Sequence, residues 1–183
     1  MLKNFNKILF AISVLSVFSL LVACTDKEET QKPSVDKKPK KESLEKANRY
    51  LFLKEKEDID DYIARHGIKV VETGTGLRYR IIKQGDGELI KQGDIIVIDY
   101  EVRLLNGKLL YSSKEDGLKT MKVGRGGVET GLEEAFLHLH KGDIAEIIIP
   151  SHLAHGLIGD GNRIPPRQPI VYKLKIIDNQ INK

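Results

Sequence analysis

From Gly76 onward, hydrophobic and polar residues alternate along the chain, which is the pattern of β-strands with one buried face. In the stretch GDIIVIDYEVRL every second position from Ile96 to Leu104 is apolar, and three of the four positions between them are charged. This alternation predicts a half-buried antiparallel strand, and Asn106-Gly107 behind it predicts a hairpin turn. Further strands are expected near Leu109–Ser112, Leu118–Val123, Asp143–Ile149 and Ile170–Ile177.

One short helix is predicted among the strands, in the stretch TGLEEAFLHLH. Thr130 and Glu133 form a capping-box pattern at its start, and Gly142 is expected to end it. Its apolar residues repeat at helical spacing and predict a single buried face. They are Leu132, Ala135, Phe136 and Leu139. The expected fold is therefore α+β, a curved antiparallel β-sheet with one short α-helix laid across it.

A longer helix is predicted before the sheet, from about Leu44 to His66, with Ser43 as its cap and Gly67 as its stop. Its apolar residues form only a partial stripe. This pattern has two interpretations. The helix is either an arm for docking or for a homodimer through residues 44–66, or it packs on its own domain or stays exposed.

The first residues have the pattern of a lipoprotein signal peptide. Residues 1–7 carry two lysines and no acid, and residues 8–23 carry no charge. This run is shorter than the about 20 apolar residues of a membrane-spanning helix, although a single-pass anchor is the alternative. The run ends in LVAC, which resembles a bacterial lipobox, and Cys24 is the one cysteine of the chain. The sequence thus predicts lipidation of Cys24, with palmitate among the acyl groups, and a membrane anchor.

Residues 24–43 are polar, contain two prolines and lack periodicity, so they are expected to form a flexible linker. The predicted organisation is then a signal peptide (1–23), this linker, a helical arm (44–67) and a domain (72–180).

Charge does not indicate nucleic-acid binding. Removal of the signal peptide leaves 28 basic and 26 acidic residues, a formal charge of +2. The basic cluster at residues 37–41 lacks the aromatic residues that a single-strand-binding surface uses. We expect it to be a solvated tether near anionic headgroups.

The histidines raise the question of a metal site, because four of the five lie within eighteen residues. His138 and His140 are two apart on the predicted helix, so their side chains point about 200° apart. His152 and His155 have no Glu, Asp or Cys at ligand spacing, so the pattern does not favour zinc or copper. No metal or cofactor is expected.

Three stretches together resemble the FK506-binding-protein (FKBP) type of peptidyl-prolyl cis-trans isomerase. They are GDIIVIDYEVRLLNGKLLYSS, VGRGGVETGLEEAFLHLHKGDIAEIIIP and LAHGLIGDGNRIPPRQPIVYKLKII, within about Gly76 to Asp178. The resemblance implies a sheet wrapped around one helix, with an apolar cleft between them for proline-containing exported polypeptides. The lipobox and the long helix resemble the exported isomerase lipoproteins of Bacteroidetes, including those tied to gliding motility. That subtype implies the periplasmic or cell-surface side of a bacterial envelope.

The resemblance also implies a set of cleft residues. They are Tyr100, Leu110, Tyr111, Val128, Glu129, Leu132, His155, Ile164 and Tyr172. At Val128 and Glu129 the expected contact is the main chain, with the Glu129 N–H donating to a bound carbonyl. His155 stands where the family usually has a tyrosine that donates to a carbonyl, and a neutral imidazole can also donate. The alternative is that His155 is only a tolerated loop residue.

Some positions depart from the family pattern. Leu132 stands where a tryptophan is typical, and Leu110 takes an aromatic position. Tyr111 replaces an aspartate, and Lys119 stands where another aromatic is common. A roomier, less aromatic cleft is expected, which puts binding of the family's macrolide inhibitors in doubt.

Three functions remain open at this point. The first is a membrane-tethered isomerase in which Tyr100, Leu132, Ile164 and Tyr172 hold the prolyl ring. The second is an FKBP-like binding or chaperone module with weak or no turnover. The third is a structural interaction protein whose long helix matters more than its cleft.

Overall fold

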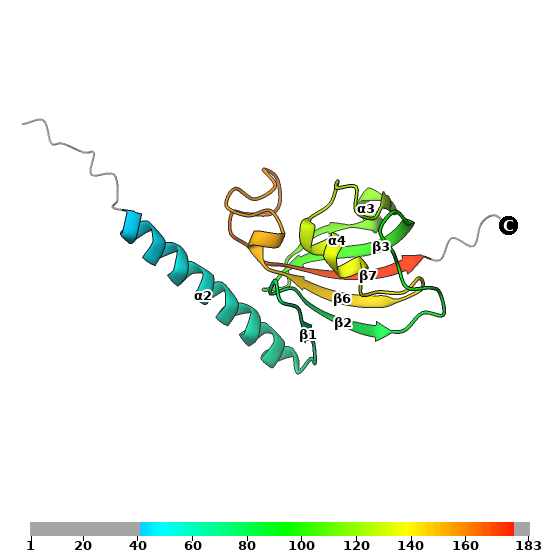
Figure 1. Cartoon of the computed structure of the whole chain (residues 1–183), viewed down its shortest axis with the longest axis horizontal. Coiled ribbons are helices and arrows are strands. Elements are labelled where there is room, and N and C mark those ends of the chain that lie inside the picture. Colours follow the sequence, from blue (N-terminus) through cyan, green and yellow to red (C-terminus); the bar gives the residue numbers. More distant parts are fainter. Residues whose placement is uncertain (1–40, 178–183) are drawn as a thin grey trace, which may run out of the picture. The chain divides into compact units, whose positions relative to one another are not determined.

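The computed structural model describes residues 41–177 (Figure 1). The expected signal peptide, Cys24 and the linker up to residue 40 lie outside these residues. In chain order the elements are α2 (Lys41–His66), β1 (Val71–Glu72), β2 (Arg78–Lys83), β3 (Ile95–Leu104), β4 (Leu109–Ser112), α3 (Ser113–Asp116), β5 (Lys119–Lys122), α4 (Thr130–Phe136), β6 (Ile144–Ile149), the 3₁₀ turn η1 (Ser151–Leu153) and β7 (Ile170–Ile177).

The strands form one antiparallel sheet in the order β1-β2-β6-β7-β3-β4, with β5 also paired to β3. This arrangement confirms the predicted fold class, and α4 lies across the sheet in Figure 1. β3 pairs along its length with β7, so that Tyr100 lies opposite Leu174 and Val102 opposite Tyr172. Because side chains alternate along a strand, these four residues share one face of the sheet. The one-turn helix α3 was not predicted.

The predicted core face of the short helix is confirmed for Leu132, Ala135 and Phe136, and Leu139 is fully buried just beyond the end of the helix. The predicted capping box is wrong. Glu129 takes the N-cap position of α4, and the Glu133 carboxylate accepts hydrogen bonds from the N–H groups of Gly124 and Gly126. The Thr130 hydroxyl donates to the Leu153 carbonyl at 3.2 Å. Glu133 therefore ties α4 to the loop directly before it, and Thr130 ties it to Leu153, 23 positions further along the chain.

The end of α4 also differs from the expectation. The helix stops at Phe136 and not near Gly142, and residues 137–140 continue as a turn and a β-bridge. His138 and His140 therefore lie beyond the helix. His138 is exposed and stacks on Tyr79, with ring centroids 5.1 Å apart.

Helix α2 begins at Lys41, so residues 41–43 of the expected linker are helical and Ser43 is not the cap. Of the described residues, those from Glu42 to Ile177 form one compact unit. Ile59 and Tyr62 on α2 are buried with Ile148 and Val171 in a second small core on the other face of the sheet. The C-terminal half of α2 is thus packed on its own domain.

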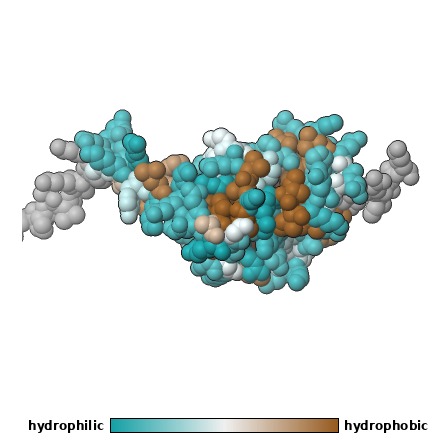
Figure 2. Space-filling view, turned by 90° about the horizontal axis from the view of Figure 1, so that it is seen from below, coloured by the Kyte–Doolittle hydropathy of each residue, from teal (hydrophilic) through white to brown (hydrophobic). Residues whose placement is uncertain are grey.

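The N-terminal half of α2 leaves apolar side chains at the surface. Figure 2 shows hydrophobic surface over part of this helix as well as over the domain, and the exposed side chains on α2 include Leu44, Leu51, Phe52 and Leu53. Among residues 41–177, no helix is both long enough and apolar enough to cross a membrane.

The junction between α2 and the sheet contains a buried polar cluster. The Tyr62 hydroxyl donates to Glu146 at 3.2 Å, and the Arg80 guanidinium donates to the same carboxylate at 2.6 Å. Burial, together with the Glu146 carboxylate, raises the pKa of Tyr62 to about 12. The neutral phenol is therefore the form that the folded state favours.

This raised pKa predicts a loss of stability in alkali. The contribution of Tyr62 is fully present below the unfolded pKa of about 10 and is lost as the pH rises towards 12. We expect the urea midpoint of the wild type to fall between pH 9.5 and 11.5 more steeply than that of Tyr62→Phe. Equal slopes for the two proteins would contradict the assigned environment of this tyrosine.

Candidate functional site

The nine residues implied by the resemblance come from distant segments and meet around α4. Leu110, Leu132, Ile164 and Tyr172 are buried members of the main core. Tyr100, Tyr111 and Val128 are partly buried and pack against the same core. Glu129 and His155 join the group through hydrogen bonds, as described below. The structure therefore places the whole set in one region, between the sheet, α4 and the loop after η1.

Two tyrosines form the wall on the sheet side. The rings of Tyr100 and Tyr172, from the adjacent strands β3 and β7, have centroids 6.3 Å apart and are tilted by 39°. Burial raises the pKa of both hydroxyls, and for Tyr172 the shift is large because the Glu129 carboxylate adds to it. Both hydroxyls are therefore neutral donors near pH 7.

The side chain of Glu129 lies inside the site. Its carboxyl group accepts hydrogen bonds from the Tyr172 hydroxyl, with oxygen–oxygen distances of 3.0 and 3.2 Å. His155 Nε2 lies 2.9 Å from Glu129 Oε1. The Glu129 side chain is 9% exposed and that of His155 28%. One carboxyl group thus connects the sheet wall to the loop.

The resemblance implied only a main-chain role for Glu129, so sequence reasoning missed that its carboxyl group belongs to the candidate site. The signal was a charged residue in a stretch expected to line an apolar cleft. The same contact bears on His155. Its Nε2 already faces Glu129, so Nδ1 is the ring nitrogen left for a ligand unless the Nε2 contact opens.

Asp160, also missed from the sequence, organises the loop above the cleft. It accepts a hydrogen bond from the Tyr111 hydroxyl and from the backbone N–H groups of Asn162 (2.9 Å) and Ile164 (2.8 Å). Burial alone would raise the pKa of Asp160, but these hydrogen bonds outweigh it and lower the pKa below its usual value. Tyr111, where the family has an aspartate, therefore holds the loop segment that presents Ile164.

Arg163 closes the same loop from the other side. Its guanidinium lies 5.0 Å above the Tyr111 ring centroid and donates to the Leu110 carbonyl at 2.6 Å. A guanidinium over an aromatic face is attracted by the ring, and the planar fork leaves further N–H groups for Glu115 at 3.0 Å. The loop is thus fixed to β4 by two independent contacts.

An opening of about 370 Å³ lies at the N-terminal side of α4. Three of the predicted residues line it, namely Val128, Glu129 and His155, together with Lys119, Gly127, Thr130 and Ala154. Lys119, whose position departs from the family pattern, is one of these lining residues. The opening is therefore more polar than an aromatic-lined cleft would be.

The histidines make local contacts. His152 Nε2 lies 3.1 Å from the Thr75 carbonyl, and the backbone N–H of His140 donates to the Asp143 carboxylate at 2.8 Å. Within residues 41–177, no three His, Cys, Asp or Glu side chains are grouped as metal ligands would be.

Comparison with known proteins gives consistent results. The family model described as FKBP-type peptidyl-prolyl cis-trans isomerase matches residues 87–177. The probable FKBP-type isomerase FkpA of Neisseria meningitidis is 33% identical over 150 residues, which are 82% of this chain and 52% of that protein. FkpA of Escherichia coli is 30% identical over 165 residues, 90% of this chain and 54% of that protein. The chain thus spans about half the length of these relatives.

Among solved structures, the crystal structure of AtFKBP13 matches with a TM-score of 0.58 and 26% identity, over 60% of this chain and 98% of that chain. The matched family segment contains β3 to β7, α4 and every cleft residue named above. Through this segment, the chain belongs to the FKBP-type peptidyl-prolyl cis-trans isomerase family.

Proposed function

We propose that the chain is a peptidyl-prolyl cis-trans isomerase that assists the folding of exported proteins. The observation that supports the proposal is that Leu132, Ile164 and Tyr172 belong to one hydrophobic core, against which Tyr100 packs. Tyr100 is partly exposed, and Leu132, Ile164 and Tyr172 are at most 4% exposed; the proposal assigns the prolyl ring to the apolar region that these four side chains form. Family membership of residues 87–177 supports the same activity.

No covalent bond is broken in this reaction. The C–N bond of the Xaa-Pro amide rotates, and the barrier to this rotation is about 18–20 kcal/mol. An apolar cleft favours the twisted amide, whose carbonyl is less polar than that of the planar ground state. If the cleft stabilises the twisted amide over the planar one by about 1.4 kcal/mol, exchange is tenfold faster. In this mechanism the apolar residues hold the prolyl ring, while His155 and the Glu129 N–H hold the flanking carbonyls.

The proposal includes a tether. The lipobox-like LVAC at residues 21–24 supports lipidation of Cys24, and the basic residues 37–41 suit a segment near anionic headgroups. The protein would then act on the periplasmic or cell-surface side of a bacterial envelope, as a lipoprotein of the exported Bacteroidetes type. Fractionation of cells tests this tether, because a Cys24→Ser variant that stayed with the membrane would overturn it.

The first experiment is exchange spectroscopy by NMR on a short Leu-Pro peptide with residues 25–183 added. Uncatalysed exchange takes tens to hundreds of seconds, so acceleration at a low protein-to-peptide ratio is easily measured. We expect catalysed exchange that a proline-containing competitor peptide suppresses. A folded protein that bound peptide without accelerating exchange would refute the isomerase.

One observation favours a second candidate, a binding module with little turnover. The Glu129 carboxyl group lies in the cleft wall between Tyr172 and His155. A carboxylate next to a prolyl ring loses solvation when a peptide covers it, which opposes the apolar environment that the rotation requires. Tight peptide binding with no rate enhancement would select this function.

A further inference from the structure

We propose that α2 belongs to the machinery of the cleft, because Glu55 and Asn48 on this helix act as positioning residues for the loop 151–167. This loop carries His155 and Ile164 into the site. The proposal rests on the proposed isomerase function for its kinetic readout, but its structural consequence can be measured without any activity.

The first connection holds the start of the loop. One Glu55 oxygen accepts a hydrogen bond from the Ser151 backbone N–H at 2.6 Å, and the other accepts from the Ser151 hydroxyl at 2.5 Å. Hydrogen bonds to an ionised group are shorter and stronger than those between neutral groups. Ser151 is 8% exposed, so water competes little for either donor. The two residues are 96 positions apart, so only the tertiary structure brings them together.

The second connection holds the end of the loop. Asn48 Oδ1 accepts a hydrogen bond from the Arg167 guanidinium at 3.2 Å. Arg167 has a φ of 55°, and no other residue of 41–177 besides glycines has a positive φ. Its own N–H donates to the Gly156 carbonyl at 2.8 Å, which closes the loop on itself. The positive φ of Arg167 is unfavourable for a residue with a side chain, and these two hydrogen bonds hold the backbone in that conformation.

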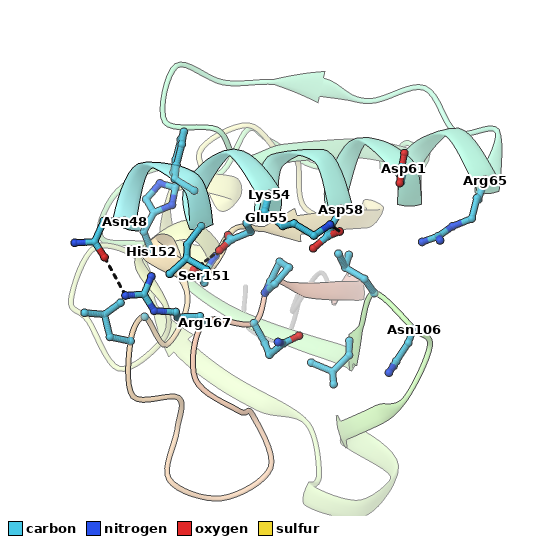
Figure 3. A pocket seen from close by; sticks show the side chains of 18 of the residues that line it. Asn48, Lys54, Glu55, Asp58, Asp61, Arg65, Asn106, Ser151, His152 and Arg167 are labelled. Carbon is cyan, nitrogen blue, oxygen red and sulfur yellow. Dashed lines mark hydrogen bonds and ion pairs between the residues drawn. The ribbon is translucent and has the colours of Figure 1, made fainter. Parts of the chain in front are cut away.

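Both contacts come from one face of α2, since Asn48 and Glu55 are seven residues, or about two turns, apart. Figure 3 shows the Asn48 side chain directed from the helix towards Arg167 and the Glu55 side chain directed towards Ser151. Between the helix and the loop lies a cavity of about 900 Å³. Asn48, Glu55, Ser151 and Arg167 are among the residues that line this cavity, so polar contacts, and not dense packing, set the distance between α2 and the loop here.

The loop transmits this constraint to the cleft over a short distance. The Gly156 N–H donates to the Ser151 carbonyl at 2.7 Å, so the residue after His155 is fixed directly to the residue that Glu55 holds. His155 in turn reaches Glu129. Displacement of Ser151 must therefore move the imidazole relative to the cleft wall.

The anchoring of α2 itself does not depend on Glu55. Ile59 is 1% exposed and Tyr62 7%, and both pack on β6 and β7 in the second core. Removing the Glu55 carboxylate should therefore leave the helix docked and release only the loop, which separates positioning from folding.

The test uses residues 25–183 carrying Glu55→Ala, Glu55→Gln or Asn48→Ala, with Glu57→Ala as the matched control. Glu57 is exposed and lies two residues further along the same helix. We expect Glu55→Ala to lower kcat/KM for the Leu-Pro peptide about three- to tenfold, mainly through KM, because the loop contacts the peptide. Glu55→Gln should recover part of the loss, since its amide oxygen still accepts from Ser151.

The structural readout is the set of backbone amide signals of His155 and Ile164. We expect them to shift in Glu55→Ala and Asn48→Ala, while signals from β3 and from the second core stay in place. Unchanged loop signals in both variants would overturn the proposal even if the wild type has no isomerase activity. An active wild type with equal kcat/KM in Glu55→Ala and Glu57→Ala would also overturn it.

Discussion

Replacing Tyr172 with alanine is expected to lower isomerisation of a Leu-Pro peptide at least about tenfold in the protein that remains folded. The ring is 4% exposed, stands beside Tyr100 and holds the Glu129 carboxyl group by its hydroxyl. The variant loses the apolar wall and also leaves this carboxyl group with one donor fewer. Exchange spectroscopy measures the effect on turnover.

Stability must be measured in parallel, because truncation of a buried aromatic residue costs about 3–5 kcal/mol in free energy of unfolding. Tyr172→Phe is the matched control, since it keeps the ring and removes only the hydrogen bonds to Glu129. We expect this control to retain most of the turnover. Unchanged turnover in a folded Tyr172→Ala protein would show that catalysis takes place elsewhere.

Replacing Gly131 with alanine is expected to reduce both stability and activity. Gly131 is buried on α4, and a Cβ atom there would lie 2.5 Å from Ile149 Cγ2 and 3.0 Å from Leu153 Cβ. Ile149 is β-branched and fully buried on β6, so it has little freedom to move aside. Overpacking of this kind costs about 1–3 kcal/mol, more than the about 1 kcal/mol that alanine gains as a helix former.

The displacement should also reach the cleft. Helix α4 carries Leu132 and begins directly after Glu129, so a shift of the helix away from β6 misplaces both. Gly74→Ala is the matched control, because nothing lies within 4 Å of its Cβ position and its φ is not positive. We expect a lower urea midpoint and slower peptide exchange for Gly131→Ala only. Equal midpoints for the two variants would refute the close contact between α4 and β6.

The local part of the fold could be predicted from the sequence. The alternation from Ile96 to Leu104 identified β3 and its buried face, and the stripe of Leu132, Ala135 and Phe136 identified the core side of α4. These predictions succeeded because periodicity reports which side of an element is buried, and burial of apolar area is the dominant favourable term in folding. The capping box failed because the Thr130 side chain donates to the Leu153 carbonyl and the Glu133 side chain accepts from Gly124 and Gly126, so neither caps the helix.

The resemblance to a known family supplied the residues of the candidate site, whereas their contacts came only from the structure. Glu129 reaches His155 across 26 positions and Tyr172 across 43, and Asp160 reaches Tyr111 across 49. No periodic pattern encodes which polar groups meet after the chain folds. That choice depends on how the strands, α4 and the loop are placed relative to one another.

The long helix shows the same division between sequence and structure. Its helical pattern and its end at His66 could be predicted from the sequence, but its partial apolar stripe left its partner open. The tertiary structure decided that Ile59 and Tyr62 pack on the sheet and that Glu55 holds Ser151. Helix formation depends on residues three or four apart, whereas docking depends on the surface that the rest of the chain presents.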